Sequence, residues 1–85
     1  TDMEVLLIED SVVDARLVEA IISSSDLAQP TLHHASRFAQ ALAMLSAQSY
    51  DLVLLDLHLP DGEGIGLIKE LKQQSPELPV VVLTG

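Results

Sequence analysis

The sequence predicts an α/β domain built around a parallel sheet. Two observations point to this fold class: short aliphatic runs without polar interruptions, and stretches between them in which apolar residues recur at intervals of three and four. The runs are typical of strands buried on both faces, and the intervening spacing is typical of amphipathic helices. Because the two patterns alternate, we expect parallel strands joined by right-handed helical crossovers, with helices on both faces of the sheet.

The first half of the chain is predicted to form two strands, each followed by a helix. Val5 to Glu9 is the first buried strand. Ser11 is then placed to cap a helix. The apolar positions of this helix are Val13, Leu17, Val18, Ile21 and Ile22.

The next unit of the chain is a weaker strand followed by a helix. Thr31 to Ala35 is the weakest strand, and a second helix starts at Ser36. Its apolar stripe consists of Phe38, Ala41, Leu42 and Leu45.

The second half continues the alternation. Leu52 to Asp56 is the next buried strand, and the Pro and Gly residues between positions 59 and 64 indicate a loop. A third helix ends before Pro76, and its apolar positions are Ile65, Ile68 and Leu71. Val80 to Thr84 is the last strand. The order is βαβαβαβ, and we expect a single domain over residues 1–85.

The composition argues against several classes of function. Thirteen acidic residues against four basic ones give a formal charge of −9, which argues against binding to nucleic acid or to an anionic membrane. The absence of cysteine excludes disulfides, thiolate catalysis and cysteine-ligated zinc. No apolar run approaches the ~18 residues of a membrane span, and no basic leader region is present. We therefore expect a soluble, cytoplasmic module.

Acidic residues follow two of the predicted strands. Glu9 and Asp10 close the first strand, and Asp56 closes the third, while Thr84 adds a hydroxyl after the last one. Ligands bind at the carboxyl ends of parallel strands, and carboxylates crowded there repel one another unless a divalent cation or a proton intervenes. These residues therefore indicate a cation and phosphoryl site at one edge of the sheet.

Three segments resemble the receiver domain of two-component response regulators: Ile8-Glu9-Asp10-Ser11, residues 55–62, and Val82-Leu83-Thr84-Gly85. They occur in the family's order and cover nearly the whole chain. The resemblance implies a flavodoxin-like, doubly wound parallel sheet with strand order 2-1-3-4. The chain corresponds to the N-terminal portion of such a domain, with the fifth strand, its lysine and the last two helices absent. If these residues are the whole molecule, we expect the exposed sheet edge to drive dimerisation or strand exchange.

The resemblance also implies roles for the acidic residues. Asp56 is the phosphoryl acceptor, served by a histidine kinase or a phosphotransfer protein, and Thr84 is the switch hydroxyl. Mg²⁺ is held directly by Asp10 and Asp56, through a water by Glu9, and by the backbone carbonyl of His58. Such a domain assists its own phosphorylation and dephosphorylation but turns over no external substrate, and it acts on an output domain that the sequence does not identify.

Two other functions stay open. A degenerate receiver would act only as a protein interaction module and would show no Mg²⁺-dependent phosphorylation. A metal-dependent phosphohydrolase would use Asp56 as a transient nucleophile. Haloacid-dehalogenase-like enzymes, however, require a second acid two positions after the nucleophile, where this chain has His58.

The remaining polar residues near the motifs have simpler interpretations. The side chain of His58 is a candidate for controlling the access of water to the acyl phosphate. We expect solvated charges at Asp14, Asp61 and Glu63, because helix N-termini favour acids. We expect surface or packing residues at His33 and His34.

Overall fold

A computed structural model of the chain describes residues 3–24, 30–57, 59 and 64–83. Its elements are β1 (Glu4–Ile8), α1 (Val12–Ser23), β2 (Thr31–Ala35), α2 (Phe38–Ala47), β3 (Leu52–Asp56), α3 (Gly64–Gln74) and β4 (Val80–Leu83). The four strands form one parallel sheet in the order β2-β1-β3-β4. This order confirms the predicted topology.

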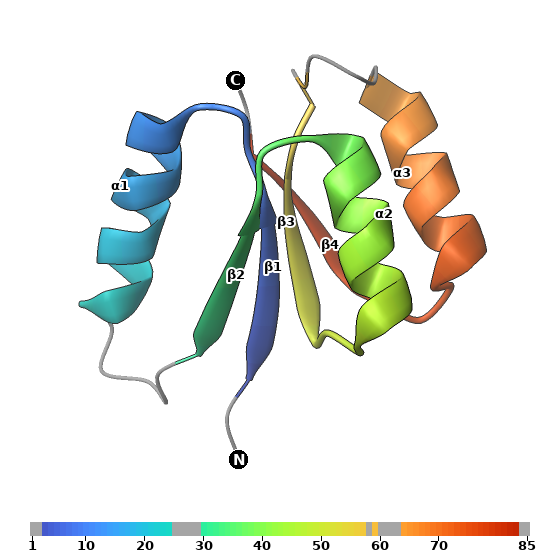
Figure 1. The fold of residues 1–85 in the computed structure, drawn as a ribbon, viewed down its shortest axis with the longest axis horizontal. Helices are drawn as coiled ribbons and strands as arrows, with labels where there is room; N and C mark the ends of the chain where they lie inside the picture. Colours follow the sequence, from blue (N-terminus) through green and yellow to red (C-terminus); the bar gives the residue numbers. More distant parts are fainter. Residues whose placement is uncertain (1–2, 25–29, 58, 60–63, 84–85) are drawn as a thin grey trace.

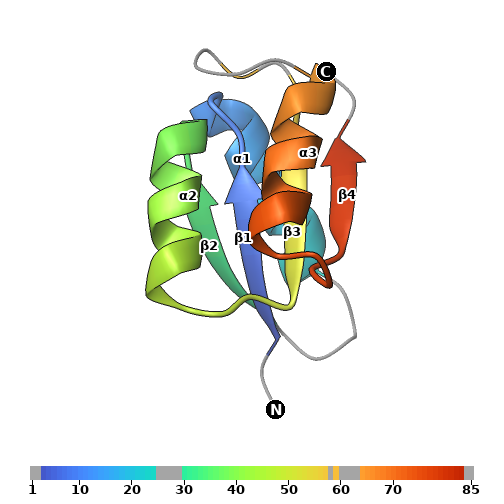
Figure 2. The ribbon, with the colours of Figure 1, turned by 90° about the vertical axis from the view of Figure 1, so that its right-hand side faces the viewer.

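Helices cover both faces of the sheet. In Figure 1, α1 lies on one side of the strands while α2 and α3 lie on the other. Figure 2 shows the sheet nearly face-on behind α2 and α3, with β1 and β3 in the middle and β2 and β4 at the edges. Among the described residues, no helix has the length and apolar character needed to span a bilayer.

The two central strands are buried on both faces. Side chains alternate along β1, so that Leu6 and Ile8 face α2 and α3 whereas Val5 and Leu7 face α1. The buried residues on the side of α2 and α3 are Leu6, Ile8, Ala35, Phe38, Ala41, Val53, Leu55, Leu59, Leu67, Leu71 and Leu78. The aliphatic runs of β1 and β3 therefore correspond to two-sided burial, as predicted, whereas Val81 and Val82 of the edge strand β4 are exposed.

Helix α1 buries less of its apolar surface than its sequence pattern predicts. Ala15 is buried, and Val18 and Ile22 pack against the sheet. Val13 and Leu17 are 77% and 59% exposed, respectively. The apolar arc of α1 is wider than the face that meets the sheet, and the residues outside that face stay in solvent. On α3, Ile65 was likewise predicted to lie on the apolar face of the helix, but its side chain is exposed. The buried residues of this helix are Leu67 and Leu71.

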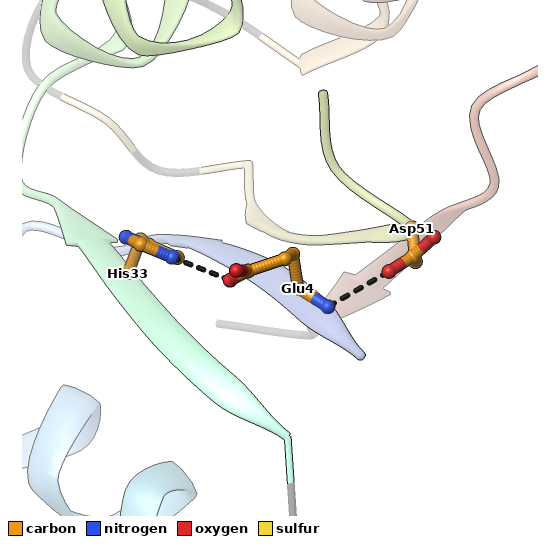
Figure 3. Close-up of polar contacts among 3 residues, drawn as sticks. All are labelled: Glu4, His33 and Asp51. Carbon is orange, nitrogen blue, oxygen red and sulfur yellow. Dashed lines mark hydrogen bonds and ion pairs between the residues drawn. The ribbon is translucent and has the colours of Figure 1, made fainter. Parts of the chain in front are cut away.

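Glu4 ties the amino-terminal end of β1 to β2 and to the residue that precedes β3 (Figure 3). Its backbone N–H donates to Oδ2 of Asp51, at 2.8 Å, and its carboxylate Oε2 lies 2.7 Å from Nε2 of His33. The ring of Tyr50 meets that of His33 edge-on, with centroids 5.3 Å apart. Burial, and then the charge of Glu4, raise the pKa of Tyr50. His33 is thus more than the surface or packing residue that we predicted, because it pairs with a carboxylate.

Candidate functional site

Three carboxylates converge where β1 and β3 end. One oxygen from each of Glu9, Asp10 and Asp56 lies within 4.8 Å of the corresponding oxygens of the other two. The strands β1 and β3 are neighbours, with Ile8 opposite Leu55, so the residues that follow these positions emerge side by side. The strand order and the position of the acids at the strand ends therefore bring together the residues that the sequence singled out.

Burial divides the three acids into an inner pair and an outer member. Glu9 and Asp56 are each only 5% exposed, whereas Asp10 is exposed. The alternation of side chains places Glu9 and Asp56 on the α1 face of the sheet. They open into a cleft of about 480 Å³. Its other lining residues are Asp14, Leu17, Val18, Val82 and Leu83.

The surroundings of Glu9 disfavour its charged form. Burial is the largest cause of its raised pKa, because desolvation penalises the carboxylate. The backbone N–H of Ser11 opposes this shift by donating to Oε1 of Glu9, at 3.2 Å. A hydrogen bond with Asp56 and the charges of Asp56 and Asp14 raise the pKa further. A bound cation would reverse this balance, because it would favour the charged carboxylates.

The donor set fits a small divalent cation. All three side chains offer carboxylate oxygens, which are the ligands that Mg²⁺ prefers. Because the three oxygens lie within 4.8 Å of one another, Glu9, Asp10 and Asp56 could hold one such ion between them, and it would supply positive charge among the carboxylates.

Ser11 begins α1 directly after the acidic residues. It is the N-cap of this helix, as predicted, and its hydroxyl accepts from the backbone N–H of Asp14, at 3.2 Å. Asp14 is exposed in the first turn, which agrees with the predicted solvated charge. Asp14 nevertheless lines the cleft, and its charge acts on Glu9.

One contact at the site was not predicted from the sequence, and it comes from β2. Nε2 of His34 lies 2.6 Å from the backbone carbonyl oxygen of Glu9. His34 is exposed, as expected of a surface residue, but its contact with Glu9 was not expected. A signal was available, because the predicted strand order places the second strand beside the first, with a polar side chain near the carboxyl end of each.

Other predicted site residues lie outside the described residues. These are His58, Thr84, Asp61 and Glu63. Their roles stay predictions.

Comparison with known proteins identifies the family of this chain and its fold. The model of the response regulator receiver domain family matches residues 5–85. The chain belongs to this family. The sheet is accordingly the flavodoxin-like arrangement of receiver domains, as the motifs implied.

Individual relatives agree with this assignment. The receiver chain is 35% identical over 83 residues to the swarming motility regulation protein RssB of Serratia marcescens, in a match that covers 98% of this chain and 36% of that protein. A signal receiver domain of an HD domain-containing protein from Pseudomonas fluorescens Pf-5 matches with a TM-score of 0.88 and 32% identity, over 100% of this chain and 66% of that one. The phosphorylated cyanobacterial phytochrome response regulator RcpA matches with a TM-score of 0.87 and 29% identity, over 99% of this chain and 66% of that one. The chain thus spans about a third of the first relative and about two thirds of the two solved chains.

Proposed function

We propose that this receiver chain is a phosphoacceptor module in which Asp56 takes a phosphoryl group from a phosphohistidine. The donor is a histidine kinase or a phosphotransfer protein. The observation that carries this proposal is the convergence of three carboxylates within 4.8 Å at the ends of adjacent strands, in a chain of the receiver family. The similarity to a phosphorylated response regulator also supports it.

Asp56 is the nucleophile in this proposal. One oxygen of its carboxylate attacks the phosphorus atom and forms a P–O bond while the P–N bond to the donor imidazole breaks. The imidazole nitrogen keeps the electron pair of the broken bond, and the product on this chain is an acyl phosphate. The position of Asp56 at the end of a central strand and at the rim of the cleft supports this role.

Mg²⁺, when bound, supplies positive charge that offsets the repulsion between the carboxylates and the incoming phosphoryl group. Asp10 and Asp56 would hold it directly, and Glu9 would act mainly through a water. The backbone carbonyl of His58 would complete the protein ligands. The exposure of Asp10 suits a ligand that meets a hydrated ion from solvent, whereas the burial of Glu9 suits a fixed outer carboxylate.

Two further parts belong to the proposal. The hydroxyl of Thr84 acts as the group that responds to the phosphoryl oxygens. Residues 1–85 form the N-terminal portion of one receiver domain, which acts on an output domain of the full-length protein. The matches that cover only 36% and 22% of two curated relatives support the presence of such further segments in proteins of this family.

Incubation of the full chain with Mg²⁺ and acetyl phosphate tests the acceptor. Intact-mass spectrometry should show one phosphoryl group that is stable to acid and labile to base. The group should be lost in Asp56→Asn and kept in Asp14→Asn, which alters an acid of the same cleft outside the converging three. An adduct that survives Asp56→Asn would refute the assignment. A parent chain that takes up no phosphoryl group with Mg²⁺ would favour the degenerate receiver instead.

A further inference from the structure

The peptide groups on both sides of Glu9 are held by the edge strand β2. The backbone N–H of Glu9 donates to the carbonyl oxygen of Ala35, at 3.0 Å. Its carbonyl oxygen lies 2.6 Å from Nε2 of His34. A carbonyl oxygen carries no hydrogen, so Nε2 of His34 must be the protonated ring nitrogen and the donor of this bond. β2 therefore restrains the chain on either side of the Glu9 Cα atom.

The ring of His34 takes the place of the next donor of the sheet ladder. In a regular parallel ladder, a strand residue donates to one residue of the neighbouring strand and accepts from the residue two positions further on. For Glu9 these partners are Ala35 and Arg37. Arg37 is already the N-cap of α2, where the chain leaves the sheet, and the carbonyl accepts from the His34 side chain. The side chain thus extends the pairing of β1 and β2 by one bond.

This extra bond ends where the acidic residues begin. The carbonyl that His34 holds belongs to the peptide group whose nitrogen is that of Asp10. A rotation of this peptide would swing the Asp10 side chain, and it would change how the Glu9 side chain leaves the end of β1. Asp10 is exposed, so packing of its side chain does not fix its direction, whereas Glu9 is buried. The hydrogen bond from His34 to this peptide therefore affects the direction of the Asp10 side chain more than that of Glu9.

We propose that His34 is a positioning residue for the divalent-cation site: its ring N–H orients the Glu9–Asp10 peptide so that the Asp10 carboxylate faces Asp56. This inference rests on the proposed function, because it takes the three carboxylates to be the ligands of a cation. Residues that orient metal ligands from outside the coordination sphere typically change metal affinity by about 10–100-fold when they are replaced. We expect an effect near the lower end of that range, because His34 acts through a backbone group.

Two substitutions separate the hydrogen bond from the bulk of the side chain. His34→Leu removes the donor and keeps a side chain of moderate size, whereas His34→Gln keeps an N–H donor. The neighbouring His33→Leu is the matched control, since His33 contacts Glu4 near the other end of β1. Isothermal titration calorimetry with Mg²⁺ on the full chain should show about tenfold weaker binding for His34→Leu. Replacement of residues that orient metal ligands without contacting the metal has effects of this size in other proteins. His34→Gln should recover most of this loss, and His33→Leu should bind as the parent does.

A second measurement does not depend on the cation. In the metal-free protein, nitrogen-15 NMR should show a proton on Nε2 of His34, and the amide resonance of Asp10 should move in His34→Leu and return in His34→Gln. Parent-like Mg²⁺ affinity in His34→Leu would overturn the positioning role. Equal weakening in His34→Leu and His34→Gln would also overturn it, since that result assigns the effect to packing.

The behaviour of the parent chain separates the role of His34 from the proposed function. If the parent binds Mg²⁺ and is phosphorylated while His34→Leu binds equally well, only the role of His34 is wrong. If the parent binds no Mg²⁺, the proposed function and the cation role of His34 are both wrong. In that case the Asp10 amide still reports whether the His34 ring sets this peptide.

Discussion

Asp56→Asn should stabilise the metal-free protein although it removes the proposed acceptor. Oxygens of Glu9, Asp10 and Asp56 lie within 4.8 Å of one another, and Glu9 and Asp56 are each only 5% exposed. Two unit charges at that limit of 4.8 Å repel by about 3.5 kcal/mol at an effective dielectric constant of about 20. Water around the exposed Asp10 weakens the part of this repulsion that involves Asp10. We therefore expect the free energy of unfolding to rise by about 1–3 kcal/mol.

Urea denaturation at neutral pH in EDTA measures this gain. Glu70→Gln is the matched control, because it removes the same unit charge from an exposed position on α3. A surface substitution of this kind should change the free energy of unfolding by no more than about 0.5 kcal/mol. Added Mg²⁺ at 100 times its dissociation constant should stabilise the parent by about 2.7 kcal/mol and Asp56→Asn by much less.

Two results would refute this reasoning. An Asp56→Asn protein no more stable than the parent in EDTA would show that the carboxylates do not repel measurably in the native state. An equal gain in Glu70→Gln would assign the effect to the net charge of −9 and not to the site.

Three further predictions concern residues around the site. The pKa of Glu9 is raised in the native state, so the native state keeps this proton to a higher pH than the unfolded chain does. The free energy of unfolding of the metal-free protein should therefore fall as the pH rises from the usual pKa of a glutamate through that of native Glu9. Glu9→Gln should flatten this part of the pH profile, and superimposable profiles would contradict the assignment. Ser11→Ala should lower the free energy of unfolding by about 1 kcal/mol through loss of the N-cap bond to Asp14, as measured by thermal unfolding, with Ser11→Asn close to the parent. Leu55→Ala, at a fully buried position beside Asp56, should cost about 2–5 kcal/mol in urea denaturation, and a cost below 1 kcal/mol would show that the core there can collapse around the gap.

The strands and the convergence of the acids could be predicted from the sequence for a definite physical reason. A strand buried on both faces tolerates few polar residues, so Leu52 to Leu55 stands out without knowledge of its neighbours. Parallel strands end at a common edge, so Glu9 and Asp56 meet there once β1 and β3 are adjacent. Backbone topology alone determines this proximity.

The features that the sequence did not reveal depend on side-chain packing. The pattern of α1 marks its apolar positions but not which part of a wide apolar arc meets the sheet, so Val13 and Leu17 were expected to pack and are exposed instead. The bond from His34 to Glu9 depends on whether the ring of His34, within β2, reaches the carbonyl oxygen that follows the end of β1. Such contacts follow from rotamers and local backbone direction, which residue spacing does not specify.

The alignment of β1 with β3 has a consequence for folding. A slip of β3 by two residues would keep every side chain on its own face, but it would set an aliphatic residue opposite a carboxylate: Leu7 would face Asp56 in one direction, and Leu54 would face Glu9 in the other. Burial of apolar surface therefore favours the native pairing over either slipped one. The slip would, however, move Asp56 by about 6.6 Å relative to Glu9, given a rise of about 3.3 Å per residue. Without a cation, carboxylate repulsion favours the slipped pairing, whereas a cation shared by both acids favours the native one. A cation shared by Glu9 and Asp56 would thus act in the same direction as the burial of apolar surface, and both would hold the central strands in the native alignment.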